Sequence, residues 1–166
     1  IWGARVFDNF GMTEAGMITS NPLEGERIPG AVGYPLPGVS LRIADKNGKA
    51  VPVGERGVIE IKGPNVFKGY WRMPDKTAQE FRSDGYFISG DVAVQEPDGR
   101  VSIVGRSKDL IIAGGYNIYP KEIEDVLDAV EGVSESAVIG VPHPDLGEAV
   151  VALVVAKHGA APTQEA

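Results

Sequence analysis

The run from Gly105 to Asp125, GRSKDLIIAGGYNIYPKEIED, restricts the fold of this chain more than any other stretch. The apolar residues at 110–112 predict a buried strand that ends at Gly114 and Gly115, where the backbone needs positive φ or something else approaches it closely. Pro120 fits the first turn of a helix, and the acidic residues after it favour the N-terminal end of that helix. The run predicts a strand, a turn and a helix, which an ordinary structural unit would also contain.

The residues after Arg106 predict an α+β unit with its own core. The apolar residues Ile123, Val126, Leu127 and Val130 recur at the spacing of one helix face and predict a helix over 119–130 that ends before Gly132. The expected strands of this part are 109–113, 133–141 and 148–156. We therefore predict a first domain at 1–106 and a second, small α+β domain at 107–166.

Residues 1–106 predict a small, mostly antiparallel sheet or distorted barrel, because short alternating runs are separated by glycine and proline. Lys46–Gly48 has the sequence of a tight hairpin turn. The expected elements are strands at 4–7, 39–43, 58–61, 85–94 and 100–104, a short helix at 74–81 and a turn at 97–99.

Composition excludes several classes of function. The 166 residues include 16 basic and 23 acidic side chains, a net charge of −7 that argues against a general nucleic-acid binder. There is no cysteine, and His143 and His158 stand far apart, so a zinc site is not expected. No apolar stretch approaches the roughly 20 residues of a membrane span. We expect a cytoplasmic protein.

Both ends of the sequence suggest a piece of a longer protein. The chain begins with Ile1, directly before an expected strand, and it stops shortly after Thr163, which is suited to cap a helix that does not follow.

The stretch Asn9–Gly16, NFGMTEAG, carries the first group of candidate site residues, and we expect it to form a loop. Phe10 could offer a flat apolar face to a ring such as adenine. Thr13 could bond a phosphate oxygen, and Glu14 could hold Mg²⁺, which takes oxygen ligands. A capped turn with Phe10 in the core and the polar side chains in solvent explains the same residues.

Three further positions have both a functional and a structural interpretation. Asp91, in ISGD, follows a strand and a glycine and could accept hydrogen bonds from two ribose hydroxyls, or could simply close a turn. Arg106 could donate to ribose or phosphate oxygens, or form a surface ion pair. We expect Tyr70 and Trp71 to pack in the core, and His143, between two prolines, to belong to a structural turn.

Taken together and in order, four segments resemble the acyl- and aryl-CoA synthetases, members of the adenylate-forming superfamily that includes luciferases and peptide-synthetase adenylation domains. The match covers nearly the whole chain. The matching segments are FGMTE at 10–14, GERGVIEIKGPNVFKGYW at 54–71, DGYFISGD at 84–91 and GRSKDLIIAGGYNIYPKEIE at 105–124. Within the superfamily, four stretches are most similar to malonyl-CoA synthetases: SNPLEGERIPGAVGYPLPGV at 20–39, GPNVFKGYWRMP at 63–74, GGYNIYPKEIE at 114–124 and ESAVIGVPHPDLGE at 135–148.

The resemblance implies the C-terminal portion of the adenylate-forming fold and a two-step reaction with ATP, Mg²⁺ and coenzyme A. A small carboxylic acid attacks the α-phosphate of ATP, and the thiol of coenzyme A then displaces AMP from the acyl-adenylate. Between the steps the small domain is expected to rotate. The expected partners are these substrates and the remainder of the same polypeptide, with no nucleic acid.

The resemblance also implies residue roles. Phe10 replaces the usual tyrosine against adenine, and Ser89 stands where threonine is common. The implied nucleotide, magnesium and coenzyme A contacts are Phe10, Gly11, Met12, Thr13, Glu14, Asp91, Arg106, Gly114 and Gly115, with Thr13 and Glu14 catalytic, Glu14 on the metal, Gly115 lining the pantetheine tunnel and Lys108 at the hinge.

Two parts of the family pattern are missing from these 166 residues: the phosphate loop that ends in lysine and the lysine near the C-terminus. We expect the chain alone to be inactive. Three alternatives stay open: a fatty-acid or 4-coumarate type of synthetase, a peptide-synthetase adenylation domain, and a non-catalytic module that binds a nucleotide or a partner.

Overall fold

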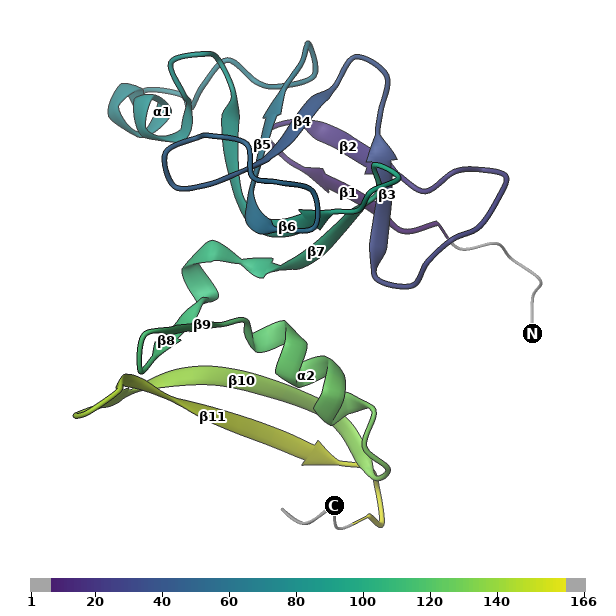
Figure 1. The fold of residues 1–166 in the computed structure, drawn as a ribbon, viewed down its shortest axis with the longest axis vertical. Coiled ribbons are helices and arrows are strands. Elements are labelled where there is room, and N and C mark those ends of the chain that lie inside the picture. Colours follow the sequence, from purple (N-terminus) through teal and green to yellow (C-terminus); the bar gives the residue numbers. More distant parts are fainter. Residues whose placement is uncertain (1–6, 161–166) are drawn as a thin grey trace. The chain divides into compact units, whose positions relative to one another are not determined.

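The computed structural model describes residues 7–160, and the chain divides into two compact units, residues 1–103 and 104–166. The division falls three residues before the predicted domain boundary. The strand expected at 4–7 and the helix cap expected at Thr163 lie outside the described residues, apart from Phe7. Figure 1 shows the strand-rich unit 1 and the smaller unit 2 in the colours of the sequence.

Unit 1 is built on a seven-stranded sheet with the order β1-β2-β3-β7-β6-β5-β4. The pairs for which the register is defined are antiparallel, as predicted. The strands are β1 Asn9–Met12, β2 Gly16–Ser20, β3 Ala31–Pro35, β4 Ser40–Ala44, β5 Arg56–Lys62, β6 Phe87–Gln95 and β7 Val101–Arg106.

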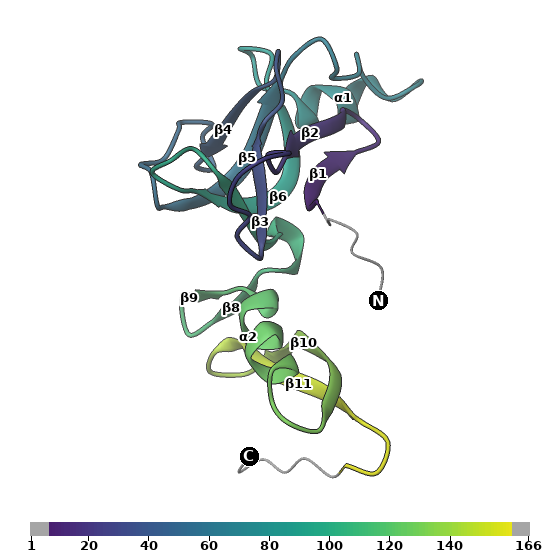
Figure 2. The ribbon, with the colours of Figure 1, turned by 90° about the vertical axis from the view of Figure 1, so that its right-hand side faces the viewer.

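The sheet curls around one apolar core. Phe10 of β1 and Ile43 of β4 come from the two edge strands, yet both belong to the same buried cluster. Ile59, Ile61 and Phe87 fill its centre and are almost completely buried. Burying a side chain of this size stabilises the fold by about 1.5–3 kcal/mol. Figure 2, turned by 90°, shows the strands of unit 1 wrapping around this interior.

The predicted turns and the short helix of unit 1 are present. The turn at Asp45–Gly48 is closed by a bond from the Gly48 N–H to the Asp45 carbonyl, but a single bridge between Ala44 and Ala50 follows it instead of a second strand. Helix α1, Pro74–Glu80, begins with proline at its first position, as expected for a residue with no N–H to donate.

Several expectations for unit 1 are wrong. Residues 9–12 were expected in a loop but form β1, which pairs with β2. Strands β2 and β3 were not predicted, because glycine and proline interrupt their short apolar runs. Trp71 was expected in the core but is 85% exposed.

Unit 2 contains a four-stranded sheet with the order β10-β11-β8-β9. The strand predicted at 109–113 begins only at Ile111, because Asp109 belongs to a 3-10 turn at Ser107–Asp109, and β9 was not predicted. The elements are β8 Ile111–Ala113, β9 Tyr116–Ile118, α2 Pro120–Asp128, β10 Val133–His143 and β11 Gly147–Ala156.

Helix α2 is tied to β10 by its acidic face as well as its apolar one. The Glu124 carboxylate accepts a hydrogen bond from the Val138 N–H at 2.9 Å. Ile123 and Leu127 are half-buried, whereas Val126, which was expected on the same face, is 68% exposed. Within residues 7–160, no helix has the length and apolar character needed to cross a membrane.

Candidate functional site

The turn between β1 and β2 presents Thr13 and Glu14, and the loop that follows β5 donates hydrogen bonds to the backbone of this turn. The Phe67 N–H donates to the Glu14 carbonyl at 2.7 Å, and the Asn65 side-chain amide donates to the Ala15 carbonyl at 2.8 Å. Thr13 is exposed and Glu14 is half-buried. The turn is therefore fixed by residues about 50 positions away, while its hydroxyl remains accessible.

The side chain of Glu14 is oriented by Tyr70. The Tyr70 hydroxyl donates to Glu14 Oε1 at 3.1 Å. Burial, followed by the hydrogen bond to Glu14, raises the pKa of Tyr70 to about 12. The phenol therefore remains a proton donor at neutral pH. Tyr70 was expected as a core residue; it is half-buried, and its polar end reaches the candidate site.

Gly11 and Met12 lie at a shallow cavity of ≈ 530 Å³ on the hairpin, which is lined by Asn9, Gly11, Met12, Gly16 and Met17. A side chain at Gly11 would place its Cβ 2.7 Å from the Gly16 carbonyl oxygen. Because real Cβ atoms do not approach backbone this closely, the close pairing of β1 and β2 itself requires glycine at this position.

Phe10 points to the opposite side of β1. Its side chain is 8% exposed and lies in the core with Ile18 and Phe87. Phe10 therefore lies in the core, as the structural interpretation of the sequence expected. The role of Phe10 against adenine stays a prediction.

Asp91 lies in an irregular part of β6. Val58 pairs with Val92 and Glu60 with Ile88, so the single residue Ile59 faces the three residues Ser89–Asp91. Such a bulge changes the direction of side chains and is frequent next to functional sites. Gly90 has φ +78°, and the Asp91 N–H donates to the Ser89 hydroxyl at 3.0 Å. Asp91 itself is only 5% exposed.

The register beside this bulge is fixed by a buried ion-pair cluster. Glu60 has no exposed surface, and its Oε2 lies 2.7 Å from Arg42 Nη2, while Oε1 lies 2.8 Å from Arg82 Nε. Arg42 also pairs with Asp84 at 2.7 Å and lies over the Tyr86 ring at 3.9 Å. A carboxylate buried this deeply needs such partners. The cluster holds the start of DGYFISGD against β5.

The remaining predicted residues lie from the end of β7 onward. Arg106 ends that strand, and Lys108 is exposed within the 3-10 turn that follows. Gly114 and Gly115 form the two-residue loop between β8 and β9, with φ of +57° and +84°. Positive φ at both positions is the signature of a type I′ hairpin turn.

The glycine pair therefore has the positive φ that the sequence offered as one of two explanations for it. A Cβ at Gly115 would meet nothing within 4 Å in the described residues. The hairpin needs glycine for its backbone angles, independently of any ligand that passes beside it.

The loop containing His143 is structural, as expected. His143 Nδ1 accepts hydrogen bonds from the N–H groups of Asp145 and Leu146 at 3.2 and 3.3 Å. The Leu146 carbonyl then accepts from the Gly114 N–H at 2.9 Å, and Glu148 accepts from the Ile112 N–H at 2.7 Å. The loop thus braces the hairpin that carries the glycine pair.

The described residues fit a magnesium site in which the protein supplies a single carboxylate. Within residues 7–160, no group of three or more His, Asp or Glu side chains is placed to hold a metal. Mg²⁺ in nucleotide enzymes typically uses one or two carboxylates and takes its other ligands from phosphates and water. Glu14, a carboxylate on an accessible turn with a neutral donor on one oxygen, satisfies that pattern.

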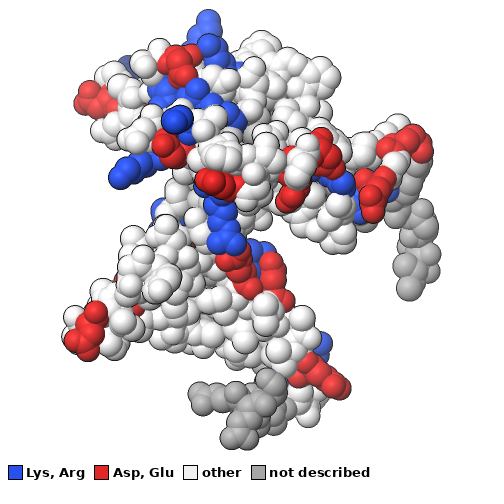
Figure 3. Space-filling model, in the orientation of Figure 1, with Lys and Arg blue, Asp and Glu red and all other residues white. Residues whose placement is uncertain are grey.

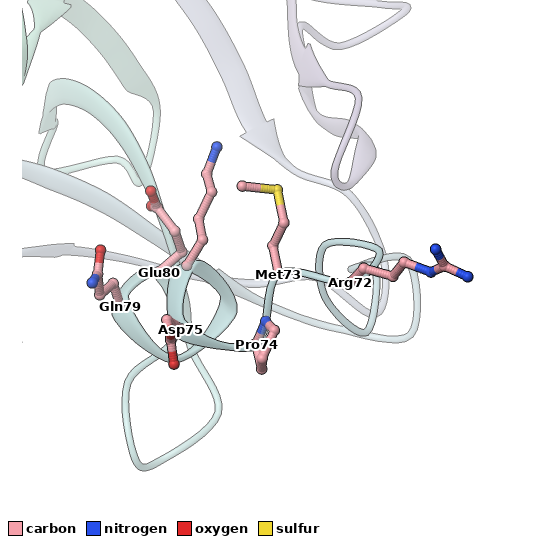
Figure 4. Close-up of a pocket in the computed structure, with 7 residues that line it drawn as sticks. Arg72, Met73, Pro74, Asp75, Gln79 and Glu80 are labelled. Carbon is pink, nitrogen blue, oxygen red and sulfur yellow. The ribbon is translucent and has the colours of Figure 1, made fainter.

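A second cavity of unit 1 contains none of the candidate site residues. A cavity of ≈ 480 Å³ lies at the start of α1, lined by Arg72, Met73, Pro74, Asp75, Lys76, Gln79 and Glu80, and Figure 4 shows Arg72 extending away from the helix. On the face in Figure 3, acidic and basic side chains of unit 1 lie next to one another.

Two parts of the chain match known protein families. Residues 1–71 match the family described as AMP-binding enzyme, and residues 122–166 match the AMP-binding enzyme C-terminal domain. The chain belongs to the AMP-binding enzyme family, and it has the α+β architecture of the C-terminal portion of the adenylate-forming fold.

Two of the relatives are named as a CoA ligase and a CoA synthase. The chain is 40% identical over 164 residues to a long-chain-fatty-acid–CoA ligase of Yersinia pestis, covering 98% of this chain and 29% of that protein. It is 45% identical over 160 residues to a feruloyl-CoA synthase of an Amycolatopsis species, covering 95% and 32%.

A solved structure is more similar still. ATP-bound MatB from Rhodopseudomonas palustris superimposes with a TM-score of 0.94 at 59% identity, covering 97% of this chain and 32% of that one. The chain spans less than a third of each of these three proteins.

Proposed function

We propose that this chain is part of an ATP-dependent carboxylate–CoA ligase that makes an acyl-adenylate and then an acyl-CoA thioester. The observation that carries the proposal is the 59% identity to ATP-bound MatB across almost the whole chain. The accessible Glu14 turn and the bulge at Asp91 support it. The relatives named as CoA ligases point to coenzyme A as the second substrate.

In the first step, a carboxylate oxygen of the acid attacks the α-phosphorus of ATP, and the bond from that phosphorus to the bridging oxygen breaks, releasing pyrophosphate. Thr13 would bond an α-phosphate oxygen, and Glu14 would hold Mg²⁺, which offsets the charge that develops on the phosphates. Asp91 would accept hydrogen bonds from the ribose hydroxyls, with Arg106 as a second contact.

In the second step, the thiolate sulfur of coenzyme A attacks the acyl carbon, and AMP leaves with the electrons of the broken bond. Gly114 and Gly115 would line the pantetheine path, and Lys108 would lie at the hinge of the small domain. Phe10 would contact the adenine of the nucleotide, and Met12 with Gly11 would line the acyl side. We expect the whole protein to act in the cytoplasm.

For the acid, we propose malonate or a related small dicarboxylate. The sequence resemblance to malonyl-CoA synthetases supports this choice, and the identity to MatB exceeds that to the fatty-acid and feruloyl relatives. Those two relatives favour a second candidate, a long-chain or aryl acid. A peptide-synthetase adenylation domain and a module that binds nucleotide without turnover are the remaining alternatives.

Pyrophosphate release by the full-length protein tests the proposal with a panel of acids. We expect ATP-dependent release with malonate, weaker release with monocarboxylates, and none from the 166-residue chain alone. Release with long-chain or aryl acids but not malonate would replace the dicarboxylate with the second candidate. Binding of ATP without release with any acid would favour the non-catalytic module.

A further inference from the structure

Tyr70 and Glu14 are 56 residues apart in the sequence, yet they form one hydrogen-bonded pair in unit 1. Glu14 lies on the β1–β2 turn, whereas Tyr70 lies on the loop between β5 and α1. The backbone of the same loop also holds the turn through the Phe67 N–H. The loop therefore fixes both the main chain and the carboxylate of Glu14.

Tyr70 is itself held from several directions. Its N–H donates to Thr77 Oγ1 at 2.9 Å, and Thr77 is anchored in α1 by a bond to the Met73 carbonyl. Its ring packs edge-on against Phe67, with centroids 4.8 Å apart, and Lys76 Nζ lies 4.2 Å over its face. The phenol hydroxyl is thus presented to Glu14 by a fixed ring rather than by a mobile side chain.

Gly69 explains how the loop reaches this arrangement. Its φ is +142°, and a Cβ there would lie 2.6 Å from Thr77 Cγ2. The absence of a side chain lets the loop pack directly on α1 and turns the next residue, Tyr70, toward the β1–β2 turn.

A phenol suits the partner of a metal-binding carboxylate. A lysine or arginine in the same place would compensate the negative charge that attracts the cation, whereas a neutral hydroxyl orients one oxygen and leaves the charge in place. The hydroxyl contacts Oε1, so Oε2 can point toward a cation. Hydrogen-bond partners of this kind typically alter metal affinity by about 10–100-fold.

We propose that Tyr70 is a positioning residue that orients the Glu14 carboxylate for the divalent cation of the nucleotide site. This inference rests on the proposed function, because it takes Glu14 as the magnesium ligand. Tyr70 acts through Glu14 and does not itself contact substrate.

The test measures cation binding directly in the full-length protein. Mn²⁺ is titrated into the complex with a non-hydrolysable ATP analogue, and bound Mn²⁺ is followed by electron paramagnetic resonance. Tyr70→Phe removes the hydroxyl and keeps the ring against Phe67 and Lys76. Tyr34→Phe is the matched control, because the Tyr34 hydroxyl also contacts a carboxylate, Asp98 at 3.4 Å, elsewhere in the same sheet.

We expect Tyr70→Phe to weaken Mn²⁺ binding about ten-fold, with AMP binding in the absence of metal and the thermal midpoint unchanged. Tyr34→Phe should leave all three quantities at wild-type values. An unchanged Mn²⁺ affinity in Tyr70→Phe overturns the positioning role, as does an equal loss in both tyrosine variants.

A third variant, Glu14→Gln, distinguishes failure of the Tyr70 positioning role from failure of the magnesium role of Glu14. If Glu14→Gln weakens Mn²⁺ binding while Tyr70→Phe does not, the positioning role fails and the magnesium role of Glu14 survives. If neither substitution changes Mn²⁺ binding, both the positioning role and the assignment of Glu14 to the metal are wrong.

Discussion

The buried carboxylate of Glu60 offers the sharpest test of how unit 1 is held together. Glu60 is fully buried, and its two oxygens contact two different arginines. Arg42 reaches Oε2 through both Nε, at 2.8 Å, and Nη2, at 2.7 Å, while Arg82 Nε reaches Oε1 at 2.8 Å. The perturbation is Glu60→Gln, which preserves shape and volume and removes only the charge.

The magnitude follows from these contacts. Glutamine can still accept from one arginine, but its NH₂ group would face the other guanidinium and lose the charge-assisted bonds there. Removing one partner of a buried ion pair costs about 3–5 kcal/mol. The side chains of Arg42 and Arg82 are 21% and 27% exposed, so water can partly solvate them. We therefore expect a loss near the lower limit, about 3 kcal/mol.

Urea unfolding of the 166-residue chain, followed by circular dichroism, measures this loss. With an m value of about 2 kcal/mol/M, the midpoint should fall by about 1.5 M. The control is Asp125→Asn, which breaks the solvent-exposed pair with Lys121 and should leave the midpoint nearly unchanged. A Glu60→Gln midpoint equal to the wild type, or higher, would refute the reasoning.

Three further predictions follow from single positions. The hydrogen bond from Arg42 holds the pKa of the Asp84 carboxyl below its ordinary value of 3.8. This pair therefore stabilises the fold above about pH 4, and its contribution disappears as pH falls through the lowered pKa. The difference in urea midpoint between wild type and Asp84→Asn should shrink toward acid pH, and growth of that difference would contradict the prediction. In the full-length protein, Asp91→Ala should raise the apparent KM for ATP by about 10–100-fold, the loss of hydrogen bonds to a charged group, and a normal KM in steady-state assays would remove Asp91 from the nucleotide site. Gly115→Leu and its control Gly159→Leu alter glycines with similar φ, +84° and +80°, and with open space around the Cβ. Both substitutions should destabilise the fold, but Gly115→Leu alone should slow thioester formation more than adenylate formation in single-turnover assays. Equal slowing of the two steps by Gly115→Leu would count against the tunnel role.

The sequence predicted elements wherever a local rule was sufficient. Alternation in β4 and β5, and the proline start of α2, each depend on neighbours within a few residues, and all appear at nearly the predicted bounds. Strands β2 and β3 were missed because glycine and proline interrupt their short apolar runs, although β2 pairs with β1 directly before it in the chain. Trp71 was placed in the core by its chemistry alone, which cannot tell an aromatic residue facing the core from one facing solvent.

The sequence predicted which residues belong to the candidate site, but not the contacts that hold them in place. FGMTE and ISGD could be found by pattern, whereas the contact of Tyr70 with Glu14 links positions 56 residues apart. No periodicity encodes such a contact. The bulge at Ser89–Asp91 depends on a register set across two strands, and the glycine pair revealed its hairpin geometry only when φ was known.

The most direct test of the central claim is product analysis of one turnover by the full-length protein with malonate, ATP, Mg²⁺ and coenzyme A. We predict that AMP, pyrophosphate and malonyl-CoA form in equal amounts, and that omission of coenzyme A leaves an acyl-adenylate on the protein. Formation of ADP and phosphate in place of AMP and pyrophosphate would contradict the assignment to an AMP-forming ligase.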